Sequence, residues 1–212
     1  MNHFRLPLVL TLLVLVMPLS AGAQLYEEPK EQPKDTPKVD KAKPAKTYTA
    51  HNLWYEKPEN ISSINYATGT MIPAGTELSS IKVVGGLGRK PFIKLTTKEG
   101  GEEFRIYFKI KFHPGVTAKE FMKRMITDKP FEQLTKGLSA KEIEAIKEGR
   151  LVVGMSKEAV IMTRGYPPEH KTSSVKNDKW LFWENRFRKK AIHFDKEGRT
   201  IRPPDPRESD DL

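Results

Sequence analysis

The sequence contains no cysteine. Disulfide bonds and thiolate metal sites are therefore excluded, and the folded part must be stabilised by burial alone. No Cys follows Ser20-Ala21-Gly22, so the residue that a lipoprotein acylates is missing there. We therefore expect a protein that is soluble or peripherally bound rather than lipid-anchored.

Long hydrophobic runs are also scarce. Leu8 to Met17 is an apolar run with Arg5 before it and the small residues Ala21-Gly22-Ala23 after it. This pattern predicts a signal peptide over residues 1–23, cut after Ala23; an uncleaved anchor is the alternative, but the run is short for a membrane span. We expect a mature chain without a transmembrane helix, located in the periplasm or secreted.

Acidic residues are outnumbered, and the formal net charge is +10. Such a balance favours anionic partners through long-range attraction. For an exported protein these are lipid headgroups, lipopolysaccharide or acidic glycans rather than nucleic acid. A lysine-rich surface with no partner gives the same composition.

The two ends of the chain have little apolar sequence. Residues 24–47 are rich in Lys, Pro and Glu, and residues 203–212 form an acidic, Pro-rich tail. Such composition offers too little apolar surface to offset the entropy of ordering. We predict a disordered linker at 24–47, either a stiff spacer or a plain disordered N-terminus, and a disordered tail at 203–212.

Residues 48–115 are rich in strand-forming residues separated by Gly and Pro turn signals. The clearest strand is EFRIYFKIKF, in which alternate residues from Phe104 to Phe112 are apolar, while Arg105, Tyr107, Lys109 and Lys111 form a basic outer face. Period-two alternation predicts a half-buried antiparallel strand. We expect a small all-β domain of about five strands, with SH3-like topology.

Residues 116–202 change to helical patterns. Thr117 with Glu120 and Ser139 with Glu142 are capping boxes, which mark helix N-termini. In VVGMSKEAVIMTRGYPPEH, Ser156 is an N-cap, Gly165 ends a short helix, and Pro167-Pro168 forbids its continuation. Strands are then expected at about 179–186 and 189–195, with a last short strand at Thr200-Ile201. The fold class predicted is α+β: a β-rich domain at 48–115, then a helical connector and an α-α-β-β-β module with an antiparallel sheet at 116–202.

Residues 136–202 resemble the SmpA/OmlA family of outer-membrane assembly proteins, also called BamE. The segments that carry the resemblance are LSAKEIEAIKEGRLVVGMSKEAVIMTRGYP, KWLFWENRF and AIHFDKEGRTI. The resemblance implies two helices packed on a three-stranded antiparallel sheet. It also implies a role in the bacterial envelope, although the β-rich domain and the missing lipid cysteine depart from the family pattern.

No motif in the sequence predicts catalysis, a cofactor or a metal. The histidines form no HxxxH pair, and His193 alternates to the face opposite its neighbours. GGLGRK at 85–90 is followed by a strand rather than a helix, which favours a hairpin turn over a phosphate loop. Ser156 is explained by its capping role. We therefore predict a non-enzymatic protein with no cofactor and no metal site.

The candidate binding surface is the segment ENRFRKK, at the tip of the last hairpin. Basic side chains surround an aromatic one there, which suits an anionic membrane surface or an acidic protein; a solvated hairpin is the alternative. The candidate residues are Trp183, Arg186, Phe187, Arg188, Lys189 and Lys190. The predicted function is a protein- or membrane-surface-binding module of the envelope, in outer-membrane assembly or maintenance. The alternative is a cell-wall-associated hydrolase or a hydrolase-inhibitor-like protein.

Overall fold

The computed structural model describes residues 46–85 and 90–203. The fold is mixed α+β, as predicted, with a curled sheet of several strands and few helices. The predicted signal peptide, most of the 24–47 linker and nearly all of the acidic tail lie outside the described residues. The division of the chain at residue 115 stays a prediction.

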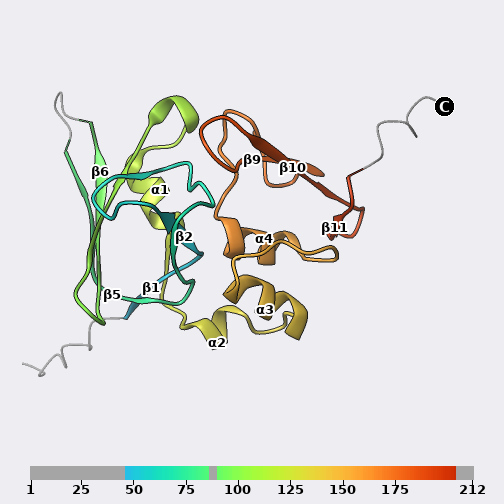
Figure 1. Cartoon of the computed structure of the whole chain (residues 1–212), viewed down its shortest axis with the longest axis horizontal. Coiled ribbons are helices and arrows are strands. Elements are labelled where there is room, and N and C mark those ends of the chain that lie inside the picture. Colours follow the sequence, from blue (N-terminus) through green and yellow to red (C-terminus); the bar gives the residue numbers. More distant parts are fainter. Residues whose placement is uncertain (1–45, 86–89, 204–212) are drawn as a thin grey trace, which may run out of the picture. The chain divides into compact units, whose positions relative to one another are not determined.

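A six-stranded sheet occupies most of the first half of the described chain, which we call the sheet half (residues 46–127) (Figure 1). Its strands follow the order β3-β7-β6-β5-β1-β8, and only β3 and β7 run parallel. Their bounds are β1 (Thr47–Thr49), β3 (Ile61–Ser62), β5 (Glu77–Val84), β6 (Phe92–Thr97), β7 (Glu103–Tyr107) and β8 (Ile126–Thr127). Strands β2 (Leu53–Tyr55) and β4 (Thr70–Ile72) form a separate antiparallel pair.

Helix α1 (Ala118–Arg124) packs on this sheet through its apolar side chains. The Thr117 side chain accepts from the Glu120 amide and the Glu120 carboxylate accepts from the Thr117 amide, so the predicted capping box is confirmed. Strand residues of alternating burial supply the core below it, including Ile93, Leu95, Phe104 and Ile106.

The strand predicted over residues 104–112 is wrong in its second half. β7 ends at Tyr107, and Ile110–Phe112 form a 3-10 turn. The amide of Lys109 donates to the Ser63 hydroxyl at 3.2 Å instead of a neighbouring strand, and the chain turns so that His113 becomes buried. Ile110, predicted to face the core, is 72% exposed as a result.

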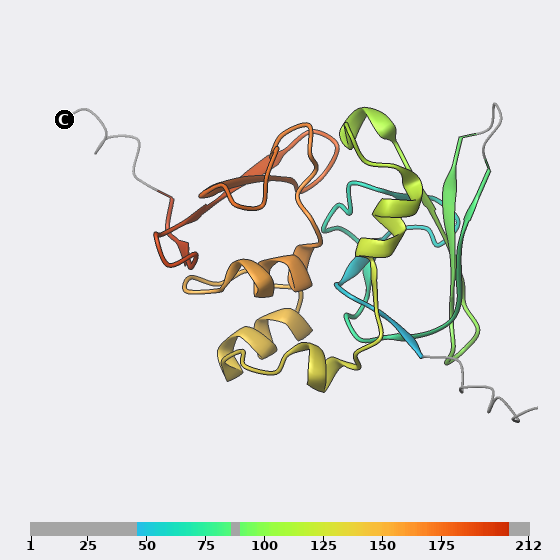
Figure 2. The ribbon, with the colours of Figure 1, turned by 180° about the vertical axis from the view of Figure 1, so that it is seen from behind.

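The C-terminal half (residues 128–203) places two helices against a three-stranded antiparallel sheet of order β11-β10-β9 (Figures 1 and 2). Side chains of α3, α4, β9 and β10, among them Ile146, Val160, Trp180 and Phe194, share one core. The elements are α2 (Phe131–Leu134), α3 (Ala140–Lys147), α4 (Lys157–Arg164), β9 (Lys179–Trp183), β10 (Lys189–Phe194) and β11 (Thr200–Ile201).

The N-termini of α3 and α4 both depend on the carboxylate of Glu142. It completes the predicted capping box with Ser139 at α3 and also accepts from the amide of Ser156, the N-cap of α4, at 2.8 Å. Burial alone would raise the pKa of Glu142, but hydrogen bonds from Ser156 and Ser139 lower it to about 2. The group is therefore charged at neutral pH, where it complements the positive ends of two helices.

Helix α4 ends as its sequence predicted, and this fixes where the chain leaves toward β9. The Ser156 side chain accepts from the Ala159 amide, and Gly165 has φ +76°. A side chain at Gly165 would be strained by that angle and would also lie about 3.1 Å from Asn65 and His51. The end of α4 is therefore held closely against the sheet half.

Asn52 forms the junction between the two halves. Its side chain is fully buried; Nδ2 donates to the carbonyl of Ile146 in α3 at 2.7 Å, and Oδ1 accepts from the Ala74 amide at 2.8 Å. Its own amide donates to the carbonyl of Met162 in α4. Asn65 adds a further link, since its Nδ2 donates to the carbonyls of Asn52 and Arg164. Both α3 and α4 are thus bonded to the sheet half through buried polar groups.

We predict that Asn52→Ala lowers the free energy of unfolding by about 1 to 3 kcal/mol, because it leaves the buried Ala74 amide without a partner and removes one of the hydrogen bonds to the Ile146 carbonyl. Urea denaturation followed by circular dichroism measures this. Asn177→Ala, at an exposed asparagine, is the matched control and should change stability by less than about 0.5 kcal/mol. Equal stability of the two variants would contradict the role of Asn52 in joining the two halves.

Candidate functional site

The hairpin tip that the sequence singled out is a hydrogen-bonded turn between β9 and β10. The Glu184 amide donates to the Arg188 carbonyl at 2.9 Å, and the Asn185 Oδ1 accepts from the amides of Phe187 and Arg188. These bonds fix the backbone while leaving the Phe187 side chain 87% exposed. The Phe187 ring is therefore available for contact with a partner.

The six predicted residues do not form one site. Trp183 stacks on His170 with ring centroids 6.2 Å apart, and Lys189 lies over the Trp183 ring at 4.8 Å. Arg188 pairs with Glu184 at 2.6 Å. Trp183, Lys189 and Arg188 are therefore occupied by contacts within the hairpin region, and Lys190 is simply exposed.

Arg186 and Phe187 line a cleft of about 880 Å³ together with residues of the sheet half. Its aromatic wall contains Trp54, Tyr55, Tyr66, Tyr107 and Phe187. Its cationic side chains are Lys57, Lys109 and Arg186, and one acid, Glu56, also lines it. We call this hollow the aromatic cleft.

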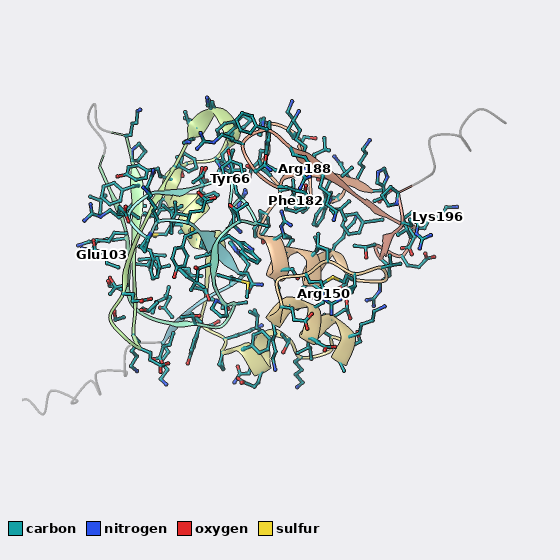
Figure 3. All side chains as sticks on the ribbon, viewed as in Figure 1. Tyr66, Glu103, Arg150, Phe182, Arg188 and Lys196 are labelled. Carbon is teal, nitrogen blue, oxygen red and sulfur yellow. The ribbon has the colours of Figure 1, made fainter. Side chains whose placement is uncertain are left out.

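Tyr66 and Arg186 are electrostatic neighbours in the aromatic cleft although 120 positions separate them. Burial raises the pKa of Tyr66, while the Ser62 hydroxyl and the charge of Arg186 lower it. The phenol therefore stays neutral at physiological pH beside a permanent cation. Figure 3 labels Tyr66 in the sheet half, Arg188 near the hairpin tip and Lys196 at the hairpin's other end.

Trp54 forms part of the wall of the aromatic cleft because its ring packs closely against Gly149. A Cβ added at Gly149, the glycine after α3, would lie 2.3 Å from the Trp54 ring, so only glycine fits there. The buried Trp54 Nε1–H has no acceptor among the described residues. That N–H is buried, so it is not exposed to the cleft.

A second arrangement has the form of a catalytic relay. His113 Nδ1 lies 2.7 Å from Glu169 Oε2, and His113 Nε2 lies 3.0 Å from the Ser63 hydroxyl. Arg124 also pairs with Glu169. Burial would raise the pKa of Glu169, but its bonds to His113 and Arg124 lower it, so the group is a carboxylate. With Nδ1–H donating to Glu169, the Ser63 O–H donates to Nε2, which is the tautomer of a serine hydrolase.

The relay has no access for a substrate in this structure. Ser63 and His113 are 4% and 2% exposed, and neither lines the aromatic cleft. The Ser63 oxygen already accepts from the Lys109 amide. The geometry fits a buried network that ties β3, the 3-10 turn and α1 to the loop after α4.

The other residues considered from sequence lie apart from both sites. Ser156 caps α4, and His51 is buried, which lowers its pKa. The segment 86–89 of GGLGRK lies outside the described residues, although β5 and β6 on either side pair antiparallel. Among the described residues no group of three or more His, Cys, Asp or Glu is placed to hold a metal ion. Within the same residues, no helix has the length and apolar character needed to cross a membrane.

Sequence reasoning identified one wall of the aromatic cleft and missed the other. The residues missed are Lys57, Trp54, Tyr55 and Tyr66. Tyr107 and Lys109 were assigned to the outer face of a strand, and that Tyr-bearing basic face was the available signal. Nothing local in the sequence indicates that this face lies opposite residue 186.

Comparison with known proteins adds no relative: no protein-family model matches the chain, and neither does any curated protein or solved structure. The assignment of the site therefore depends on geometry alone.

We predict that Ser63 does not react with a fluorophosphonate probe on the folded protein, because its hydroxyl is buried and already bonded. Mass spectrometry of the intact protein after incubation measures this. Ser63→Ala is the control for the assignment of any adduct. Labelling of the original protein that is lost in Ser63→Ala would contradict the buried-network interpretation.

Proposed function

We propose that the protein is a non-enzymatic, exported envelope protein that acts as a binding module, and that the aromatic cleft is its site. The observation that carries this proposal is the convergence of Arg186 and Phe187 with the aromatic and lysine side chains of the sheet half on one hollow. Aromatic residues and arginine dominate the binding energy of protein interfaces. An arginine beside aromatic rings also suits a carboxylate, which it binds with two parallel hydrogen bonds.

The ligand we propose is an acidic segment of a partner protein. A flat bilayer surface reaches the exposed Phe187 but not the rings deeper in a concave cleft, whereas a chain segment can enter it. Lys57, Lys109 and Arg186 outnumber the single acid Glu56, so the cleft attracts negative charge. Anionic lipid and acidic glycan surfaces are the alternative partners of the same charge.

The envelope setting comes from the sequence. The signal peptide predicted over residues 1–23 favours the periplasm or the outside of the cell, and the resemblance to the SmpA/OmlA family suggests outer-membrane assembly or maintenance. The element order α3-α4-β9-β10-β11 supports that resemblance. The curled antiparallel strands of residues 48–115 likewise support a small β domain of SH3-like kind.

One observation favours the alternative function. The Ser63–His113–Glu169 relay has the bond pattern of a hydrolase. A cell-wall hydrolase would need that serine to open to substrate, and its burial weighs against this. A hydrolase-inhibitor-like protein would instead use an exposed aromatic such as Phe187.

The double variant Arg186→Ala/Phe187→Ala should lose at least tenfold of the partner recovered by crosslinking in the native envelope, because it removes the cation and the ring at the mouth of the cleft. Quantitative mass spectrometry of the crosslinked material measures this. Lys196→Ala, which removes a charge from the turn at the hairpin's other end, is the matched control and should retain full recovery.

Equal recovery by the double variant and the control would contradict the site. Flotation with anionic vesicles distinguishes a membrane surface from a protein as the partner. Vesicle binding that is lost in the double variant, with no crosslinked protein, would replace the acidic segment by a membrane surface.

A further inference from the structure

A groove beside the aromatic cleft differs from it in chemistry. Its volume is about 880 Å³, and its lining is mainly apolar, with Phe108 and Val116 as buried members and Pro91 and Ile110 at its side. It shares Asn60, Tyr107 and Lys109 with the aromatic cleft, so the two hollows are neighbours. We call it the apolar groove.

The groove lies where the chain turns away after the end of β7. If the chain had continued as a strand to Phe112, Ile110 would face the core. The 3-10 turn instead presents Ile110 to solvent, 72% exposed, next to the groove. A large apolar side chain exposed beside an apolar hollow marks a surface that a ligand covers.

Three exposed lysines accompany the apolar lining: Lys90, Lys109 and Lys111. None of them forms an ion pair within the described part of the chain. No residue of the lining is acidic. The groove thus combines an apolar hollow with an unneutralised positive rim.

That combination favours an amphiphilic anion. A glycan or a polar peptide does not match the apolar lining, and an uncharged hydrocarbon gains nothing from the lysines. We propose that the apolar groove binds a single long acyl chain with an anionic headgroup, of the kind that a free long-chain fatty acid presents. The chain lies against Phe108, Val116 and Ile110, and its carboxylate pairs with the lysines. The volume of the apolar groove is in the ordinary range of small-molecule sites.

This proposal is independent of the function proposed for the aromatic cleft. The groove residues changed in the test, Lys90, Ile110 and Lys111, do not line the cleft, and Arg186 and Phe187 do not line the groove. Variants therefore separate the two.

The test is calorimetric titration of the purified protein with octanoate, decanoate and dodecanoate below their micelle concentrations. We expect one saturable site, with affinity rising by up to about fourfold per methylene, because each methylene leaves water for an apolar wall. Dodecanol should bind more weakly than dodecanoate. The combined variant Lys90→Gln/Lys111→Gln should remove most of that difference.

Ile110→Glu should weaken dodecanoate binding at least tenfold by placing a negative charge beside the groove. Because Ile110 is exposed in the present structure, the variant should keep its thermal midpoint, and a melting curve checks this. Phe187→Ala, in the cleft, should bind dodecanoate as the original protein does.

Three results would overturn the proposal. They are the absence of saturable binding, binding that Ile110→Glu leaves unchanged, and equal affinity for dodecanoate and dodecanol. Binding to anionic vesicles without binding of monomeric dodecanoate would assign the lysines to a bilayer surface instead.

Discussion

The proposed binding site depends on the hydrogen bonds of the buried Asn52 side-chain amide. It bonds in two directions, to Ala74 within the sheet half and to Ile146 in α3, while its backbone bonds to Met162 in α4. The aromatic cleft has one wall in the sheet half and the other at the tip of the β9–β10 hairpin. Because the hairpin packs on α3 and α4, whatever fixes those helices to the sheet half also fixes the width of the cleft.

The junction contains several buried hydrogen bonds, and this makes the packing of the two halves specific. Asn65 bonds to the end of α4, and the Ser63–His113–Glu169 network joins β3 to the loop beyond it. Buried hydrogen bonds require specific partners and angles, and the cost of leaving them unpaired disfavours alternative packings. A site whose walls come from distant parts of the chain needs that specificity. The relay therefore has a structural explanation that does not require catalysis.

The elements that the sequence predicted best are those with local signals. Both capping boxes and the helix from Lys157 to Arg164 are determined by neighbouring residues, and they are confirmed. The alternation after Tyr107 was equally clear but misleading. There, the hydrogen bonds that join Lys109 and His113 to Ser63, about 50 positions away, override the local preference for a strand. The aromatic cleft could not be predicted for the same reason, since Tyr66 and Arg186 meet only through the tertiary fold.

The most direct test of the cleft as a binding site is photo-crosslinking from single positions. A photoreactive phenylalanine analogue would replace Phe187 at the cleft and Val153, which is 57% exposed in the loop between α3 and α4. We expect an acidic protein to be crosslinked from position 187 in the native envelope and not from position 153. The same partner should be lost when Arg186 is also changed to Ala. Equal crosslinking from both positions, or crosslinking that is insensitive to Arg186, would contradict the assignment of the cleft.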